Sequence, residues 1–476
     1  MTLPAFRFDN SYRRALPGTW LAVEPAPAPA PRLLVANHGL ATELGVALEG
    51  DVAGVLSGAA LPDGAEPIAQ AYAGHQFGGF SPQLGDGRAL LLGEVIDSAG
   101  RRRDIALKGS GRTPFSRGGD GKAAVGPMLR EYLVGEAMHA LGIATTRALA
   151  VVATGEDVYR ETALPGAVLC RVAASHIRVG TFQFFSARGE ADKVQALADY
   201  TIARHYPECA TAQNPYVALF DAVTAAQARL IAQWMGVGFI HGVMNTDNMA
   251  LSGETIDYGP CAFMEGYAAG TVFSSIDHGG RYAYGNQPLI LGWNLARLAE
   301  ALLPLFDADG DKAVDLANER LGGIAARYRA EWLAVMRRKL GLVGVKDGDE
   351  ALADGLLAAM EGQGADWTLT FRRLAAAVDE DGAVLPLFAD PEPMRAWLAA
   401  WRARLEDGAA ARLLAANPAV IPRNHQMEDA LAAATGGDMG PFEALLAEVS
   451  APYVEREGYM LPAPAGFGRY VTFCGT

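Results

Sequence analysis

Apolar residues follow the period of a β-strand in much of the first third of the chain. Ala89–Ile96 is an apolar run, and Asp104–Lys108 alternates as a half-buried strand does, with a turn at Ser98–Gly100 between them. This arrangement predicts a β-hairpin. Three further short strands are predicted to complete an antiparallel sheet: Ala148–Ala153, Val158–Thr162 and Ala167–Val172.

Helical spacing interrupts these strands once and then dominates the second half of the chain. The first predicted helix follows a Gly-rich loop and has apolar residues at 3.6 spacing: Met128, Leu129, Tyr132, Leu133 and Ala137. A long apolar helix is predicted from about Tyr216 to Val237, and Ala- and Leu-rich helix follows Tyr282 to nearly the end. Between these helical parts, Leu251–Ile256 is predicted to form a pair of short strands.

Strands in the first part and helices in the rest predict an α+β fold. We divide the chain into an N-terminal segment and sheet-containing lobe (1–173), a mainly helical lobe (174–330) and a helical C-terminal region (331–476). A chain of 476 residues is long enough for two or three packed units with substantial cores.

Composition and charge exclude several classes of protein. A net charge of −14 opposes nonspecific binding to nucleic acid, which needs a basic surface. We expect no membrane partner, because Met1–Trp20 lacks the apolar core of a signal peptide and the most apolar region, Leu230–Met244, is too short to span a bilayer. Four cysteines without metal-ligand spacing suggest a reducing compartment, so we expect a cytoplasmic protein.

The strongest chemical pattern lies between residues 241 and 259. Kinases need an Asp base in the catalytic loop, an Asn for metal and a second metal Asp downstream. Here His241, Asn248 and Asp257 keep the spacing that small-molecule kinases use, but Val243 occupies the position of the base. Valine cannot accept a proton, and Asp247 supplies a carboxylate beside the metal Asn instead. The pattern therefore indicates a nucleotide and metal site whose reaction is not plain phosphorylation.

A Gly-rich hairpin and loop precede this region in the order that kinases use. Gly85, Gly87 and Arg88 stand at the mouth of the predicted hairpin, and Lys108 ends its return strand. The loop that follows resembles a phosphate-binding loop without matching the Walker A pattern, and its candidate residues are Asp120 and Gly121. Taken alone, the hairpin is better explained as a surface hairpin whose glycines serve its turns.

Three charged residues complete the candidate site. Glu131 lies on the predicted helix where kinases place the Glu that pairs with the strand Lys, although a solvated helix Glu is the alternative. Arg171 and Arg178 could clamp phosphates or lie on the surface of a chain that favours Arg over Lys. A lone His75 among aromatic residues is interpreted as a packed, hydrogen-bonded side chain rather than a ligand.

Several ordered blocks together resemble the selenoprotein O (YdiU) family of pseudokinase-fold proteins, over almost the whole chain. The blocks are Gln76–Gly78, Leu84–Arg88, Lys108–Gly111, Gly119–Gly121, His241–Asn248, Asp257–Pro260 and Ile421–His425. The resemblance implies a kinase-like bilobal fold, with a small antiparallel sheet in the N-lobe, a mainly helical C-lobe and a helical C-terminal extension. It also implies a protein adenylyltransferase that moves AMP from ATP to Ser, Thr or Tyr hydroxyls of proteins, including itself, and releases pyrophosphate.

The resemblance also implies a role for each candidate residue. Asp247 would accept the proton, Asn248 and Asp257 would hold Mg²⁺ or Mn²⁺, and Glu131 would pair with Lys108. The residues implied to line the nucleotide site are Gly85, Gly87, Arg88, Lys108, Asp120, Gly121, Arg171, Arg178 and Asp257. The nucleotide would lie inverted relative to kinases, which explains why the base has left position 243.

Alternatives remain open from the residues alone. The same scaffold could transfer UMP from UTP with manganese, act as a kinase, or bind nucleotide without catalysis, although a non-catalytic scaffold needs no metal pair. Some relatives are thought to link a C-terminal Cys to the loop after the metal Asp. Here Cys474 has no cysteine partner in Thr271–Ser275, which makes such redox control doubtful.

Overall fold

The computed structural model describes residues 3–473, so Cys474 lies outside the described residues. The protein is a mixed α/β structure with one large antiparallel sheet and many helices. The strands are β1 (Trp20–Ala22), β2 (Arg32–Ala36), β3 (Ile68–Gln70), β4 (Gly74–Gln76), β5 (Gly79–Ser81), β6 (Ala89–Ile96), β7 (Arg102–Lys108), β8 (Ala123–Ala124), β9 (Arg147–Tyr159), β10 (Ala163–Ala173), β11 (Phe239–Ile240) and β12 (Ala262–Phe263).

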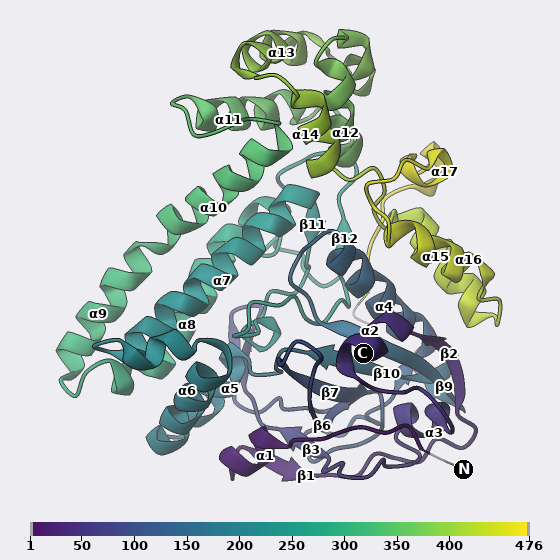
Figure 1. The fold of residues 1–476 in the computed structure, drawn as a ribbon, viewed down its shortest axis with the longest axis vertical. Helices are drawn as coiled ribbons and strands as arrows, with labels where there is room; N and C mark the ends of the chain where they lie inside the picture. Colours follow the sequence, from purple (N-terminus) through teal and green to yellow (C-terminus); the bar gives the residue numbers. More distant parts are fainter. Residues whose placement is uncertain (1–2, 474–476) are drawn as a thin grey trace.

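The helices lie mainly after the sheet in the chain. They are α1 (Ser11–Ala15), α2 (His38–Leu44), α3 (Val52–Ser57), α4 (Val125–Ala140), α5 (Val179–Ser186), α6 (Ala191–His205), α7 (Pro215–Val237), α8 (Gln287–Phe306), α9 (Gly310–Gly322), α10 (Ile324–Lys339), α11 (Asp349–Met360), α12 (Trp367–Ala377), α13 (Glu392–Arg404), α14 (Ala409–Ala416), α15 (Asn424–Thr435), α16 (Gly440–Val449) and α17 (Glu457–Met460). Figure 1 shows the sheet at one end of the molecule and α11–α14 at the other.

The main sheet has eight strands in the order β1-β3-β6-β7-β10-β9-β2, with β8 paired to β10. It is larger than the small sheet expected from the sequence, because β1, β2 and β3 add pairings that join residues far apart in the chain. The predicted hairpin is confirmed as β6 and β7, and the predicted helices are confirmed as α4 and α7.

Two predictions of local structure were wrong. Ala148–Ala153 and most of Val158–Thr162 belong to one continuous strand, β9, because its pairing with β10 extends from Arg147 to Tyr159. Leu251–Ile256 forms a turn instead of a strand pair, and single bridges at Ala250 and Thr255 hold its ends. The Leu251 amide donates to the Ile177 carbonyl just before α5, and the Thr255 amide donates to the Ala144 carbonyl just after α4.

Helix α8 is the main part of a long apolar stretch. The stretch Tyr284–Phe306 is long and apolar enough, by length and composition, to cross a membrane, and 50% of its most apolar window is buried inside the structure. The prediction that Leu230–Met244 is the most apolar region is therefore wrong, because Tyr284–Phe306 is longer and apolar enough to pass this test. Because α8 packs against α5, α7 and α9, its burial is also that of a core helix in a globular fold.

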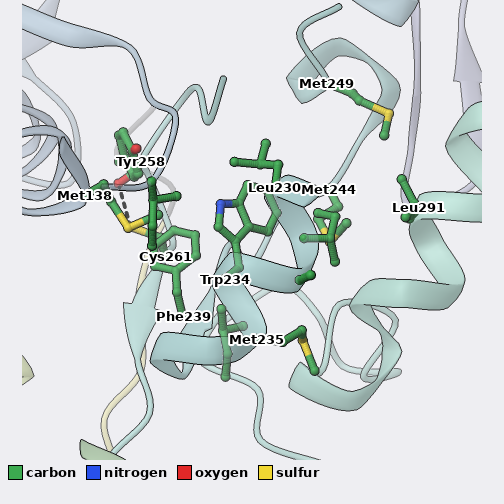
Figure 2. Close-up of a cluster of buried hydrophobic side chains, with 14 of the residues drawn as sticks. Met138, Leu230, Trp234, Met235, Phe239, Met244, Met249, Tyr258, Cys261 and Leu291 are labelled. Atoms are coloured by element: carbon green, nitrogen blue, oxygen red, sulfur yellow. Dashed lines mark hydrogen bonds between the residues drawn. The ribbon is translucent and has the colours of Figure 1, made fainter. Parts of the chain in front are cut away.

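A hydrophobic cluster supports the loop that follows α7. Figure 2 shows Leu230, Trp234 and Met235 of α7 beside Met244 and Met249 of the loop and Leu291 of α8. All of these side chains are nearly inaccessible to solvent. Close packing of this kind fixes the loop between residues 241 and 249 relative to the two longest helices of the core.

The Ile421–His425 block holds the C-terminal region to the rest of the fold. Arg423 is fully buried and donates two hydrogen bonds to Asp366, at 2.6 and 3.2 Å, and one to the Met460 carbonyl. The neighbouring Asn424 side chain donates to the carbonyl of Phe263 in β12. This block therefore joins α12, α15 and the strand that follows Asp257.

We predict that Arg423→Met lowers the stability of the protein by about 3–5 kcal/mol, because it leaves the buried Asp366 carboxylate without its cation. The matched control is Arg395→Met, which removes an exposed cation 3.3 Å from Glu392 and should change stability by less than about 1 kcal/mol. Urea unfolding of both variants measures the difference. Equal losses in the two variants would contradict the structural role of Arg423.

Candidate active site

A cavity of 1520 Å³ lies between the sheet, α4 and the segment that follows α7. Its walls bring together every residue that the sequence indicated for the site: Gly85, Gly87, Arg88, Lys108, Asp120, Gly121, Glu131, Arg171, Arg178, Asp247, Asn248 and Asp257. These residues come from separate parts of the chain between positions 85 and 257. The structure thus gathers the predicted set at one place, while the role of each residue stays a prediction.

Four charged side chains form a buried cluster at the base of the cavity. The Lys108 ammonium lies 2.6 Å from a Glu131 oxygen and 2.6 Å from Asp257 Oδ1. Arg171 makes the same two contacts, at 2.6 Å to each carboxylate. Burial alone would raise the pKa of Asp257, but Arg171, Lys108 and Arg178 together hold it well below its usual range. Asp257 is therefore ionised at any physiological pH.

The sheet register explains why these cations converge. Lys108 pairs with Leu169 and Ala106 pairs with Arg171, so Lys108 and Arg171 project from the same face of adjacent strands β7 and β10. Helix α4 covers that face and presents Glu131 to both. The pairing of Glu131 with Lys108 that the sequence suggested is present.

The backbone at Asp257 is unusual, because its φ of +64° places a non-glycine residue in the left-handed region. The preceding carbonyl, of Ile256, lies 2.9 Å from Nε2 of His241. His241 is fully buried and stacks on Trp234 with 5.3 Å between ring centroids. This histidine therefore fixes the two loops relative to each other and does not face the cavity.

Asp247 occupies a different environment in the same cavity. It is 8% exposed, its Oδ1 has no hydrogen-bond partner among the described residues, and Gln76 Nε2 lies 3.5 Å from Oδ2. Arg178 donates to the Asp247 main-chain carbonyl at 3.1 Å and so does not pair with the carboxylate there. Burial raises the pKa of Asp247 from its ordinary value of 3.8 to about 6, which suits a group that accepts a proton near neutrality.

Two glycines allow the chain to pass close to Asp247. A Cβ on Gly74 would lie 2.5 Å from Asp247 Oδ1, and one on Gly180 would lie 2.1 Å from the Ala73 carbonyl oxygen. Any larger residue at either position would push the hairpin β4–β5 or helix α5 away from the carboxylate. Val243, at the position of the kinase base, also lines the cavity and is 7% exposed.

The oxygen ligands at the site suit a hard divalent cation. Asn248 donates its amide Nδ2 to the Val243 carbonyl at 3.0 Å, which leaves its Oδ1 to face a ligand. Among the described residues, no group of three or more His, Cys, Asp or Glu could hold a metal ion. A cation at Asn248 and Asp257 would therefore need further oxygens from phosphate and water, as Mg²⁺ commonly does.

The Gly-rich segments form the rim of the cavity. A Cβ on Gly121 would meet the Gly111 carbonyl oxygen at 2.0 Å, so only glycine fits where the two loops touch. The Asp120 carboxylate is engaged by neighbours at the rim: Arg160 lies 2.8 Å from it, and the Lys122 amide donates a hydrogen bond to it. Asp120 thus shapes the rim through the hairpin β9–β10.

Sequence reasoning missed several residues of the cavity. Asp86 is 5% exposed and accepts a hydrogen bond from the Gln70 amide, and the Arg178 guanidinium lies 4.5 Å from the centre of the Tyr72 ring. Asp86 stands inside the Leu84–Arg88 block and could have been noticed as a buried carboxylate. The C-terminal residues Tyr470 and Thr472 also line the cavity. No local sequence pattern predicts that residues so distant in the chain contact this site.

A carboxylate with a raised pKa, a cluster of fixed cations and a pair of hard oxygen ligands are features of enzymes that transfer phosphorus-containing groups. The sequence profile of the family described as protein adenylyltransferase SelO matches residues 3–450. The chain therefore belongs to the SelO family, whose members catalyse nucleotidyl transfer.

Full-length relatives agree with this assignment. A protein of Cereibacter sphaeroides described as protein nucleotidyltransferase YdiU is 66% identical over 479 residues, covering 99% of this chain and 100% of the relative. A protein of Rhizobium meliloti with the same description is 57% identical over 490 residues and covers 100% of both chains.

We predict that Asp247→Asn makes the protein more stable at pH 7 by up to about 3 kcal/mol. The folded pKa lies about two units above the ordinary value of 3.8, so ionisation of Asp247 destabilises the fold as pH rises from about 4 through 6. The gain should disappear near pH 3, below both pKa values, where the wild-type carboxyl is mostly protonated in both states. Melting temperatures of both proteins across this range test it, and a constant difference would contradict the raised pKa.

Proposed function

We propose that this protein transfers AMP from ATP to a Ser, Thr or Tyr hydroxyl of a protein and releases pyrophosphate. The observation that carries the proposal is the position of the buried Asp247 carboxylate, which has no cation paired with it among the described residues. Asp247 lines the cavity and its Oδ1 has no hydrogen-bond partner among the described residues, whereas the position of the kinase base holds Val243. A base displaced in this way serves a nucleotide whose α-phosphate, and not the γ-phosphate, meets the acceptor.

The protein's own groups supply the proton transfer and the charge stabilisation. The acceptor hydroxyl oxygen forms a bond to the α-phosphorus, the bond from that phosphorus to the bridging oxygen breaks, and the hydroxyl proton passes to the Asp247 carboxylate. Lys108 uses two of its three N–H groups on Glu131 and Asp257, which leaves one for a phosphate oxygen. Fixed cations of this kind stabilise the charge that develops during transfer.

Asn248 and Asp257 would hold Mg²⁺ or Mn²⁺ together with phosphate oxygens. When bound, the cation would neutralise phosphate charge and help the pyrophosphate to leave. The cations around Asp257 keep this carboxylate ionised and therefore ready to bind a metal.

We further propose that the fold is a kinase-like bilobal one, with lobes at 1–173 and 174–330 and a helical extension at 331–476. Support comes from the order of the parts around the cavity. A strand Lys, a helix Glu, a catalytic loop and a metal Asp follow one another as they do in kinases. The nucleotide would lie in the reverse direction in the same cleft.

Among the alternatives, UMP transfer from UTP uses the same phosphate chemistry and differs only in the nucleobase of the substrate. A kinase reaction leaves Asp247 without a role, and a non-catalytic scaffold leaves unexplained a buried carboxylate that lowers stability when ionised. The relatives' description as nucleotidyltransferases leaves the choice of nucleotide open.

We predict that radiolabel from ATP labelled at the α-phosphate enters protein, and that label from the γ-phosphate does not. Parallel reactions with α-labelled UTP measure whether the protein prefers ATP or UTP. Excess chelator should abolish incorporation if Asn248 and Asp257 bind a required cation. Incorporation of γ-label alone would contradict nucleotidyl transfer and favour a kinase.

A further inference from the structure

The hairpin formed by β4 and β5 lies directly against the catalytic loop. The His75 amide donates to Thr246 Oγ1 at 2.7 Å, and the Phe77 amide donates to Asn245 Oδ1 at 3.1 Å. Gln76 and Phe77, at the turn of the hairpin, line the cavity next to Asp247. An acceptor that reaches Asp247 from outside must therefore pass close to this turn.

The other side of the hairpin packs on helix α8. The His75 ring lies 4.9 Å from the Phe80 ring and 5.1 Å from the Trp293 ring, and its Nδ1 lies 2.8 Å from the Gln183 amide nitrogen. His75 is thus a packed, hydrogen-bonded residue, as its sequence context suggested. Its role is to connect Phe80 to the surface of α8.

A cationic and apolar surface continues from this contact along α8. Leu289, Trp293 and Arg297 follow one another at intervals of four, so they lie on one face of the helix. Leu289 is 72% exposed and Phe80 is 42% exposed. We call Phe80, Arg281, Leu289, Trp293 and Arg297 the Arg281 surface.

Arg281 is the residue of this surface that lacks a counter-ion. Its guanidinium lies 4.7 Å from the centre of the Trp293 ring, whereas Arg297 on the same ring is paired with Glu300 at 2.6 Å. The buried Arg281 Nε has no hydrogen-bond partner, and no ion pair joins its side chain to a carboxylate in the described part of the chain. Arg281 is also outside the residues that line the cavity, so it is not placed to bind the nucleotide.

We propose that the Arg281 surface binds the acceptor polypeptide and selects a segment that carries a carboxylate beside an apolar side chain. The inference rests on the proposed function and adds the recognition of the protein substrate. The chain as a whole carries a net charge of −14 and repels acidic segments. An Arg without a counter-ion beside Gly78, at the turn of the β4–β5 hairpin, therefore gives such a segment a favourable place to bind. Trp293 and Phe80 would bury the apolar side chain.

The experiment uses the full chain and short fluorescent peptides with a single Ser acceptor, an adjacent Leu and either Glu or Lys at one neighbouring position. Binding is measured by fluorescence anisotropy, and transfer is measured with α-labelled ATP. Wild type should bind the Glu peptide about tenfold more tightly than the Lys peptide and modify it with a correspondingly lower KM. Arg281→Gln should remove the preference, and Arg281→Glu should reverse it.

The matched control is Arg338→Glu, which changes an exposed Arg on α10 and should keep the wild-type preference. Melting temperatures of the variants show whether each is folded. Equal binding of the two peptides by wild type, or a preference that survives in Arg281→Glu, would overturn the proposal even if AMP transfer occurs. Charge-dependent peptide binding without any transfer of α-label would leave the surface intact and refute the proposed function. Wild-type binding to anionic lipid vesicles but to neither peptide would assign the surface to a membrane and also overturn the proposal.

Discussion

The buried contacts among Lys108, Glu131, Arg171 and Asp257 are the constraint on which the rest of the site depends. Removing four charges from water is costly, and the fold offsets this cost by surrounding each carboxylate with two cations at hydrogen-bonding distance. The cluster joins β7, α4, β10 and the segment after the catalytic loop. The same contacts that hold these elements together therefore also fix the cations at the base of the cavity, so little reorganisation is needed when charge develops there.

Two aspartates in one cavity are driven in opposite directions by their surroundings. Arg171, Lys108 and Arg178 overcome the effect of burial at Asp257 and keep it ionised, whereas Asp247 is buried without a cation on its carboxylate and its pKa rises to about 6. Such separation is how sites assign different roles to chemically identical groups. Asp257 suits a permanent charge that holds a cation, and Asp247 suits a group that gains and loses a proton.

The sequence predicted the parts of this account that depend on local pattern. Period and turn signals located β6, β7, α4 and α7, and the order of Lys108, Glu131, Asp247 and Asp257 indicated one site. The same local signals missed contacts between distant segments, such as β2 with β9 and Tyr470 with the cavity, because no spacing rule links them. The Leu251–Ile256 turn was misjudged because its backbone partners lie in other elements. The Ile421–His425 block had no role assigned from the sequence, because the buried partner of Arg423, Asp366, caps the start of a helix far away in the chain.

The pH dependence of AMP transfer tests most directly whether Asp247 is the relocated base. The account predicts that kcat/KM rises with pH through a value near 6, and that Asp247→Asn lowers the rate by about 10²–10⁴-fold and removes this limb of the profile. If the variant still binds nucleotide with wild-type affinity, the loss of rate lies in the transfer step and not in nucleotide binding. Turnover of Asp247→Asn at the wild-type rate, with the limb near pH 6 unchanged, would contradict the account.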